Sequence, residues 1–516
     1  MCKREQVTSI NPITRLDYPD PDVIRVEDTY YMVCTTMHFM PGCEILRSYD
    51  LVHWEHASYV YDVLDGTDAQ KLTGEQHIYG KGMWAATLRY HKGIFYVCFV
   101  ANDTGKTYLY TASAVEGPWK KSVIEGFYHD CSLLFDEDDR VYIAYGNKHI
   151  HLQELKSDLS GPKEAGLHRI VVSDEGHPGL GYEGTHFYKI NGKYYLFFIH
   201  SLRSEWKRVE ACFMADSLEG EFVGGDVLND DMGYCNQGVA QGGIVDTPDG
   251  KWYAVLFQDR GAVGRIPVLL PITWEKDYPV FGVDGKVPET FEVTNTNPGH
   301  QYKPLVESDD FKAVGKSFGF KECWQFNHEP DMQLVRRGVE NGTVTITTDK
   351  LCKNLTQAKN TLTQRMLFPE CAGEVTVDAG ALKDGDYAGL CALQGCYGMV
   401  AVTKKDGRFY VVMKNRTADN NTLQGMPADI EEGILQETIE IENPVVRLRV
   451  EADFTQMKDE AEFFYDIGEG FRKIGVAQKL YFKMDHFTGC RFGLFIYSTK
   501  ETGGSAVFSD FAYDGI

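Results

Sequence analysis

The sequence predicts an all-β protein in which a five-bladed β-propeller is followed by a C-terminal β-sandwich. A hairpin unit recurs five times in the first half of the chain, and each unit has a polar turn followed by a tyrosine. These tyrosines are Tyr31, Tyr96, Tyr142, Tyr195 and Tyr253, at successive spacings of 65, 46, 53 and 58 residues. A repeat near 50 residues is typical of a propeller with one small antiparallel sheet per blade.

The second half of the chain predicts the sandwich. From about residue 316 onward, short alternating segments such as TVTITT and VRLRVEA are separated by Gly, Asp or Asn. No segment there has a helical period, and a long series of short antiparallel strands is typical of a sandwich. The polar stretch TNTNPGHQYKPLVESDDF precedes these strands and indicates a domain boundary. We therefore expect a propeller over residues 1–300, a linker over 301–315 and a sandwich over 316–516.

Each blade is predicted from its own unit. The units cover residues 11–62, 75–125, 127–175, 176–235 and 236–290. The fourth unit is the clearest, because the turn Asn191-Gly192 lies between the runs FYKI and YYLFFI. Asn-Gly between two apolar runs is the strongest short-range hairpin signal.

The composition excludes several classes of partner. The chain has 516 residues, too many for one hydrophobic core, and a formal net charge of −23. Nucleic acids and anionic membranes require a basic face, so this charge argues against both. No run approaches 18 apolar residues, so we expect no membrane-spanning helix.

Cysteine usage and the first residues predict the compartment. The 13 cysteines are an odd number without C-x-x-C pairs, which disfavours a zinc ribbon or a disulfide framework. Such free use of cysteine favours a reducing compartment. The opening MCKREQVTSI has no apolar signal-peptide core, and we therefore expect a cytoplasmic protein.

One position in each unit carries a side chain suited to chemistry or to binding. Counting twelve residues back from the tyrosine gives Trp84, Asp130, Glu183 and Gln241, and counting eleven back from the first tyrosine gives Asp20. In a propeller this position lies at the start of the inner strand and faces the central axis. We therefore expect the five side chains to converge on one pocket.

Taken singly, these residues also have ordinary structural interpretations. Asp20 beside proline suits a turn, and Asp130 suits a strand entry bonded to local backbone. Glu183 could lie on a loop surface, and Trp84 is either core or a sugar-stacking platform. Arg265, in a Gly-rich approach to an apolar strand, could be an exposed loop residue. The coincidence of three carboxylates at one blade position favours a catalytic interpretation.

Paired carboxylates are the usual equipment for hydrolysis of a glycosidic bond. One of them donates a proton to the leaving oxygen, and the other activates water or attacks the sugar. Close carboxylates raise one another's proton affinity, so one of the three can stay protonated at neutral pH. The third carboxylate can position that acid and adjust its pKa.

Five segments resemble glycoside hydrolase family 43, in the family's order. They are YPDPDVIRVEDTYYM, WAATLRYHKGIFYV, HDCSLLFDEDDRVYIAYG, YEGTHFYKINGKYYLFF and QGGIVDTPDGKWYAVLFQ. The resemblance implies a five-bladed propeller, hydrolysis with inversion, and the β-sandwich found in the family's β-xylosidases and α-L-arabinofuranosidases. It also implies three roles: Asp20 as general base, Glu183 as general acid, and Asp130 as the residue that orients the acid and adjusts its pKa.

The same resemblance implies the residues that bind substrate. Arg265 resembles the family's substrate-binding arginine, and Trp84 and Phe39 would line the sugar subsite. Where some relatives place a histidine that helps to hold an axial metal ion, this chain has Gln241. An amide is a poorer metal ligand than imidazole, so we expect no required cofactor and assign no metal ligand. An axial calcium or sodium ion stays open, and Gln241 could hydrogen-bond substrate instead.

Two activities of the same class follow from the resemblance. The leading hypothesis is an exo-acting, inverting hydrolase that releases terminal α-L-arabinofuranose from arabinoxylan-type oligosaccharides, with β-xylosidase side activity. The alternative is a β-D-xylosidase acting on xylo-oligosaccharides. The expected partners are therefore arabinose- and xylose-containing oligosaccharides, and no oligomeric state is predicted. A non-catalytic carbohydrate-binding propeller would lack at least one of Asp20, Asp130 and Glu183, and a structural propeller needs no axial acids.

Overall fold

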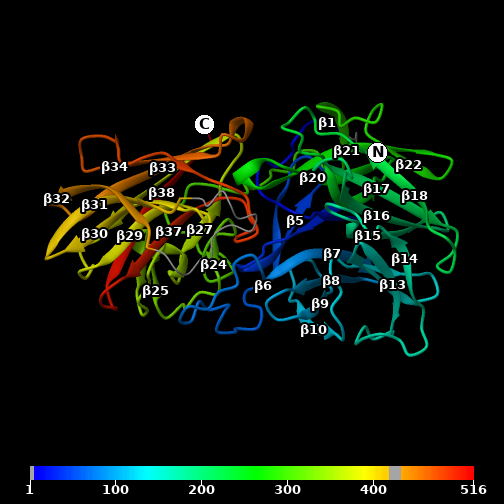
Figure 1. Ribbon diagram of the computed structural model, residues 1–516, viewed down its shortest axis with the longest axis horizontal. Helices are drawn as coiled ribbons and strands as arrows, with labels where there is room; N and C mark the ends of the chain where they lie inside the picture. Colours follow the sequence, from blue (N-terminus) through cyan, green and yellow to red (C-terminus); the bar gives the residue numbers. More distant parts are fainter. Residues whose placement is uncertain (1–4, 418–431, 516) are drawn as a thin grey trace.

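The computed structural model describes residues 5–417 and 432–515, and these residues form antiparallel strands and short 3₁₀ helices. Two bodies lie side by side, the propeller drawn in blue to green and the sandwich in green to red (Figure 1). Five four-stranded sheets form the propeller, and two larger sheets form the sandwich. In the described ranges no helix is long and apolar enough to cross a membrane. The sheets confirm the predicted five-bladed propeller followed by a β-sandwich.

Each blade pairs its four strands in chain order, and the first strands of neighbouring blades contact one another around the axis. The strands are β2 (Asp22–Val26), β3 (Thr29–Cys34), β5 (Gly42–Ser48) and β6 (Glu55–Tyr61) in the first blade; β7 (Met83–His91), β8 (Ile94–Ala101), β9 (Lys106–Ala112) and β10 (Lys120–Ile124) in the second; β11 (Ser132–Phe135), β12 (Val141–Asn147), β13 (His149–Leu155) and β14 (His168–Ser173) in the third; β15 (Glu183–Ile190), β16 (Lys193–Ser201), β17 (Arg208–Ala215) and β18 (Val223–Leu228) in the fourth; and β19 (Ala240–Asp246), β20 (Trp252–Asp259), β21 (Arg265–Glu275) and β22 (Tyr278–Phe281) in the fifth.

Local turn chemistry explains these hairpins. Asn191 and Gly192 connect β15 to β16 and have φ angles of 50° and 80°. Two consecutive left-handed residues make a turn whose twist matches the twist of the flanking strands. The pattern predicted for the fourth unit therefore forms as a hairpin.

The ring of blades is closed where the first and fifth blades meet. Strand β1 (Glu5–Ile10) pairs antiparallel with β23 (Thr290–Asn295), which follows the last blade. The amide of Gly243 in the fifth blade donates a 3.0 Å hydrogen bond to the carbonyl of Pro21, just before the first blade. These contacts bring the first and fifth blades together and complete the wall around the axis.

The sandwich consists of two sheets whose facing side chains form one large core, including Leu390 and Val400 from one sheet and Val377 and Val450 from the other. The first sheet contains, in spatial order, β32 (Ile434–Ile441), β31 (Arg408–Asn415), β30 (Gly398–Lys405), β29 (Asp386–Leu393), β37 (Arg491–Ser498), β27 (Leu362–Arg365), β24 (Gln325–Asn327) and β4 (Phe39–Met40). The second contains β25 (Val335–Gly338), β26 (Thr343–Thr347), β38 (Ser505–Gly515), β28 (Glu370–Asp378), β33 (Val445–Asp453), β34 (Glu460–Asp466) and β35 (Arg472–Lys473), with β36 (Gln478–Lys479) also paired to β34. Four short 3₁₀ helices are η1 (Gly261–Val263), η2 (Val339–Asn341), η3 (Leu355–Gln357) and η4 (Thr455–Met457). Since β4 comes from the first blade's segment, the two domains share a sheet.

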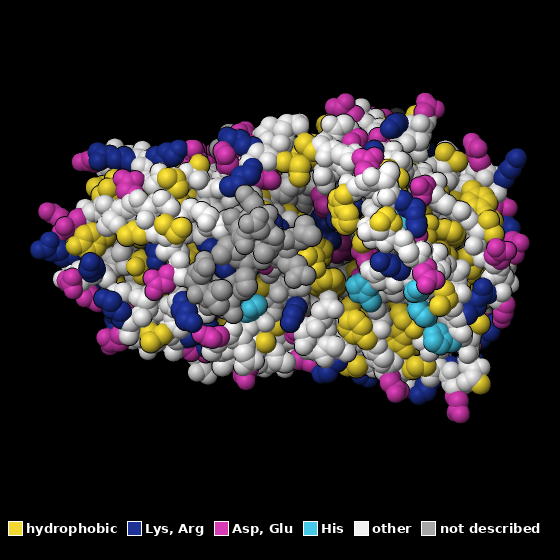
Figure 2. All heavy atoms as spheres, in the orientation of Figure 1, with side chains coloured by type: hydrophobic (Ala, Val, Ile, Leu, Met, Phe, Trp, Pro, Cys, Tyr) yellow, Lys and Arg dark blue, Asp and Glu magenta, His cyan; other side chains and the backbone are white. Residues whose placement is uncertain are grey.

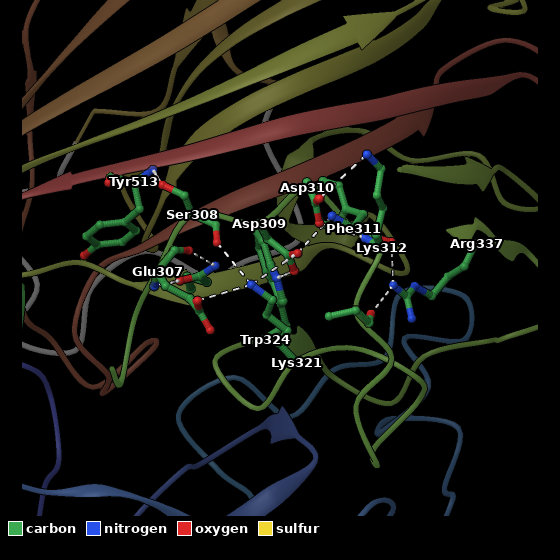
Figure 3. A network of polar contacts seen from close by, with 12 residues as sticks. Glu307, Ser308, Asp309, Asp310, Phe311, Lys312, Lys321, Trp324, Arg337 and Tyr513 are labelled. Atoms are coloured by element: carbon green, nitrogen blue, oxygen red, sulfur yellow. Dashed lines mark hydrogen bonds and ion pairs between the residues drawn. The ribbon is translucent and has the colours of Figure 1, made fainter. Parts of the chain in front are cut away.

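The segment before the sandwich is more ordered than the predicted linker. Asp309 pairs with Phe511 of β38 through two backbone hydrogen bonds of 2.8 and 3.0 Å. The carboxylate of Asp309 also accepts a 2.8 Å hydrogen bond from the indole of Trp324, and Arg337 donates to the carbonyl of Phe311 at 2.7 Å (Figure 3). The structure therefore begins the sandwich inside the segment predicted as linker, earlier than residue 316.

The molecular surface carries charges of both signs. Acidic and basic side chains are interspersed over both domains on the face seen in Figure 2. Within the described ranges all twelve cysteines are free, and all but Cys235 are buried. Most of these thiols therefore act as small apolar side chains in the core.

Candidate active site

Each inner strand is preceded by, or begins close to, a residue in the left-handed conformation. These residues are Asp20, Ala85, Asp130, Gly184 and Gln241, with φ angles of 53°, 34°, 48°, 65° and 57°. Strand register shifts beside this residue in the second, fourth and fifth blades, and such bulges redirect neighbouring side chains. Asp20, Asp130 and Gln241 occupy the left-handed position itself, whereas Trp84 and Glu183 precede it by one residue. The position counted from the tyrosines is thus the same to within one residue in all five blades.

A cavity of about 810 Å³ opens where these strands begin, within the range of about 300–1,000 Å³ usual for ligand pockets. Six of the seven predicted site residues line it: Asp20, Trp84, Asp130, Glu183, Gln241 and Arg265. Four further lining residues come from the sandwich, in the segment between β36 and β37: Phe482, Lys483, Met484 and Phe487. Both domains therefore build the cavity.

Asp20 is held by a partner on each carboxylate oxygen. Its Oδ2 accepts a 2.6 Å hydrogen bond from the hydroxyl of Thr35, and its Oδ1 lies 2.7 Å from Nη1 of Arg265. The side chain is buried, with 6% of the residue exposed. Partners of this kind fix the orientation of the carboxylate.

Glu183 and Asp130 form a coupled pair of acids. The carboxylate of Asp130 accepts a 3.0 Å hydrogen bond from the amide of Gly184, which ties it to the residue after Glu183. Burial raises the pKa of Glu183 to about 8, and the neighbouring charge of Asp130 adds to this effect. Burial also raises the pKa of Asp130, while His129, 3.7 Å away, opposes that rise. Glu183 therefore keeps its proton at neutral pH and can donate it.

Asn147 contacts the acid directly. Its side-chain amide donates a hydrogen bond to Oε2 of Glu183 from the end of β12. This donor fixes the direction in which the carboxyl group points and leaves the other oxygen without this contact. Asn147 was not among the predicted site residues, because nothing in the sequence distinguishes it from an ordinary strand-end asparagine.

An aromatic wall covers the arginine that holds Asp20. The guanidinium of Arg265 lies 4.6 Å from the ring centre of Phe487, and the rings of Trp84 and Phe487 are 5.3 Å apart. Nε and Nη2 of Arg265 are buried and have no hydrogen-bond partner among the residues that the structure describes. Buried donors of this kind are normally satisfied, so the N–H groups on these two nitrogens are available to the hydroxyls of a bound sugar.

The aromatic residues from the sandwich could not be found from the sequence. They lie in the stretch YFKMDHFT, which has no strand alternation and lies far along the chain from the propeller. Its only signal is a cluster of three aromatic residues in a segment without a strand pattern. Contact with the cavity depends on how the domains pack, which no local pattern shows.

Phe39 does not line the cavity, although it was predicted to line the sugar subsite. Its backbone is part of β4, which pairs with β24 of the sandwich. The ring is 1% exposed, and the guanidinium of Arg491 lies 3.5 Å from its centre. Because β4 extends the sandwich sheet, the side chain faces the contact between the domains rather than the sugar pocket.

The axial position offers little room for a metal ion. Gln241 packs against Gly184, where a Cβ would lie 2.5 Å from its side-chain carbon. The space on the axis, which Asp20, Asp130 and Gln241 help to line, measures about 10 Å³ and fits about one water molecule. Calcium requires six to eight oxygen ligands. Asp20, Asp130 and Gln241 alone do not supply that number, and no step of the chemistry below involves an axial ion.

A second group of possible metal ligands lies outside the cavity. Asp174, His177 and His200 each offer one atom within 4.8 Å of the others. Nδ1 of His177 accepts a 3.0 Å hydrogen bond from the amide of Gly179, and Nε2 lies 2.9 Å from the carbonyl of Ser201. Both ring nitrogens of His177 are thus engaged, so the group fits a structural role better than a metal site.

Comparison with known families identifies the two domains. Residues 9–279 match the family described as "Glycosyl hydrolases family 43". The chain belongs to glycoside hydrolase family 43. In this family 43 enzyme, residues 308–514 also match the "Beta xylosidase C-terminal Concanavalin A-like domain". The family resemblance predicted from the sequence is confirmed.

The most similar relatives of the enzyme include both xylosidases and arabinofuranosidases. It is 25% identical to a "Beta-xylosidase" of Formosa agariphila, with 98% of this chain and 90% of that protein covered. It is 32% identical to a "Putative beta-xylosidase" of Xylanibacter ruminicola, with 72% of this chain and 69% of that protein covered. A "Non-reducing end alpha-L-arabinofuranosidase" of Bacteroides ovatus is 31% identical, with 63% and 64% covered.

Solved structures agree with the fold over nearly the whole chain. A protein described as "Bifunctional GH43-CE" from Bacteroides eggerthii matches with 40% identity and a TM-score of 0.89 over 99% of this chain. The match spans 64% of that longer protein. An engineered family 43 enzyme, described as having endo-xylanase and exo-arabinofuranosidase activity, matches with 28% identity and a TM-score of 0.87, covering 99% of this chain and 100% of that protein.

Proposed function

We propose that this glycosidase is an exo-acting β-D-xylosidase that removes terminal xylose from xylo-oligosaccharides with inversion of configuration. One observation carries the proposal: Glu183, with its raised pKa, shares a cavity with Asp20, whose two oxygens are both held. A protonated acid and a fixed carboxylate are the two groups that hydrolysis of a glycosidic bond requires. The sandwich segment 482–487 closes part of the cavity, which supports action at a chain end.

The three carboxylates take different roles in this reaction. Glu183 donates its proton to the leaving glycosidic oxygen as the C–O bond breaks. Asp20 removes a proton from the water molecule that attacks the anomeric carbon from the opposite face. Asp130 raises the pKa of Glu183 with its charge and fixes the backbone at Gly184. Arg265 orients Asp20 and offers its free N–H groups to sugar hydroxyls.

The choice between xylose and arabinose rests on the relatives. More of them carry the name β-xylosidase than arabinofuranosidase, which supports the xylosidase alternative over the arabinofuranosidase hypothesis drawn from the sequence. α-L-Arabinofuranosidase activity is the second candidate, because the Bacteroides ovatus relative carries that name at 31% identity.

The test compares two aryl glycosides and one natural oligosaccharide. The enzyme should hydrolyse an aryl β-D-xyloside faster than an aryl α-L-arabinofuranoside, and it should release xylose from xylotriose. Proton NMR during the first turnovers should show α-xylose as the initial product. Glu183→Gln should remove almost all activity on xylotriose. Faster arabinoside cleavage would favour the second candidate, and β-xylose as the first product would contradict inversion.

A further inference from the structure

Trp206 presents an unusually open aromatic surface at the rim of the active-site cavity. It lies in the loop between β16 and β17, lines the cavity and is 56% exposed. An indole is large and mostly apolar, so tryptophan is highly buried on average in folded proteins. Of the described aromatic side chains that line this cavity, Trp206 is the one exposed to this extent. Its exposure beside a sugar site calls for a functional explanation.

The indole is supported by the protein next to it. Gly179 lies next to it, since a Cβ added there would lie 3.7 Å from Cε3 of Trp206. The guanidinium of Arg208 lies 5.8 Å from the ring centre and is itself paired with Asp259. The loop is closed by a 2.9 Å hydrogen bond from the amide of Leu202 to the carbonyl of Lys207. A supported ring loses little conformational freedom when a ligand stacks on it.

The position of Trp206 relative to Glu183 indicates which part of a substrate it would meet. Gly179, against which the indole packs, is four residues before Glu183 in the segment that leads into β15. Leu180 from this segment lines the cavity as well. Glu183 protonates the oxygen of the leaving group, whereas Arg265 and Phe487 lie together at Asp20. We assign the rim beside Gly179 and Leu180, which leads to the acid, to the leaving group, and Trp206 lies at this rim.

The size of the cavity leaves room for a second sugar. A pentose has ten heavy atoms, whereas pockets of about 300–1,000 Å³ enclose drug-sized ligands. The cavity of about 810 Å³ is near the top of this range. The terminal sugar would occupy the part between Asp20, Arg265 and Phe487, and the remaining space extends toward Leu180 and Trp206.

We infer that Trp206 is a stacking platform for the sugar unit that leaves, and that this unit is a pyranose. The apolar C–H face of a pyranose complements the flat face of an indole, and such contacts require no fixed hydroxyl pattern. The platform would select oligosaccharides over simple glycosides without contacting the terminal sugar. The inference rests on the proposed exo-glycosidase function and extends it to the leaving-group side.

The test separates the two sides of the cavity by comparing substrates. Xylobiose and methyl β-D-xyloside share the terminal xylose, but a methyl group is too small to stack on Trp206. In Trp206→Ala the kcat/KM for xylobiose should fall about tenfold further than that for methyl β-D-xyloside. Trp206→Phe should recover part of the loss. Tyr90→Ala, at a 42% exposed aromatic residue outside this cavity, should leave both values as in the unmodified enzyme.

Binding to an inactive enzyme gives a second readout. In a Glu183→Gln background, calorimetry should show that Trp206→Ala lowers the affinity for xylotriose about tenfold and lowers the affinity for xylose much less. Equal losses for both ligands, or no loss for xylotriose, would overturn the platform while leaving the proposed function intact. If the unmodified enzyme cleaves neither xylobiose nor xylotriose, the proposed function itself fails. Thermal unfolding of each variant checks that the fold is retained.

Discussion

Replacing Asp130 by asparagine tests the coupling between the two acids most directly. The substitution removes the charge but keeps an oxygen that can accept the hydrogen bond from Gly184. A carboxylate oxygen of Asp130 and a carboxylate oxygen of Glu183 lie within 4.8 Å of each other. At an effective dielectric constant of about 20, unit charges at that separation interact by about 3.5 kcal/mol, or about 2.5 pKa units. Solvent at the open cavity weakens this interaction, so we expect the pKa of Glu183 to fall by about 1–2 units.

The expected change appears in the alkaline limb of the pH profile. Since Glu183 works in its protonated form, kcat/KM of the unmodified enzyme should decline as the pH rises through about 8. Asp130→Asn should move that limb to about pH 6–7, because the charge that favours the protonated form is gone. Xylotriose is the right substrate, since its poor leaving group needs the acid. A nitrophenyl glycoside needs less acid assistance and should show a weaker limb.

A matched control separates this effect from net charge. Asp139→Asn makes the same charge change at an exposed turn of the same blade and should leave the profile in place. The reasoning is refuted if the alkaline limb of Asp130→Asn stays where it is or moves to higher pH. Because the two acids titrate as a pair, the measured value belongs to the pair, and the direction of the shift is the decisive result.

Two further predictions concern the contact between the domains. Phe487→Ala should lower kcat/KM for an aryl xyloside by at least about tenfold, because it uncovers Arg265 and admits water; an unchanged value would show that the sandwich ring is dispensable. Burial lowers the pKa of His38 and His328 well below 6.5 and that of His486 to about 3, so the unfolded chain binds more protons as the pH falls below 6.5. Because of these three histidines, the free energy of unfolding measured in urea should be about 4 kcal/mol lower at pH 5.5 than at neutral pH. His38→Phe should remove about a third of that difference. Equal pH dependence in the variant would contradict the assignment.

The sequence predicted most accurately what depends on local patterns. The five blades follow from turns such as Asn191-Gly192, whose conformation is set by a few neighbouring residues. The gathering of Asp20, Asp130 and Glu183 follows from the same repeat, because equivalent blade positions meet at the axis by symmetry. A periodic pattern could not show that Glu183 precedes the left-handed position by one residue, since that offset comes from a bulge.

Contacts between segments that are far apart along the chain could not be predicted from the sequence. The family resemblance placed Phe39 in the sugar subsite, but β4, which contains it, pairs with β24 of the sandwich. Phe487 completes the pocket from a segment more than 200 residues beyond Arg265. Neither pairing is encoded in local spacing, because each depends on how the two domains pack against each other.

Asp17 connects the sandwich to the active site through hydrogen bonds to both domains. Its Oδ1 accepts a 2.7 Å hydrogen bond from the amide of Arg265, and its Oδ2 accepts a 2.8 Å hydrogen bond from the amide of Gly489. Arg265 holds Asp20, and Gly489 follows Phe487 by two residues. One buried carboxylate thus joins the strand that carries the arginine to the segment that carries the covering ring. A shift of the sandwich would move both together, so the geometry around Asp20 depends on the packing of the domains.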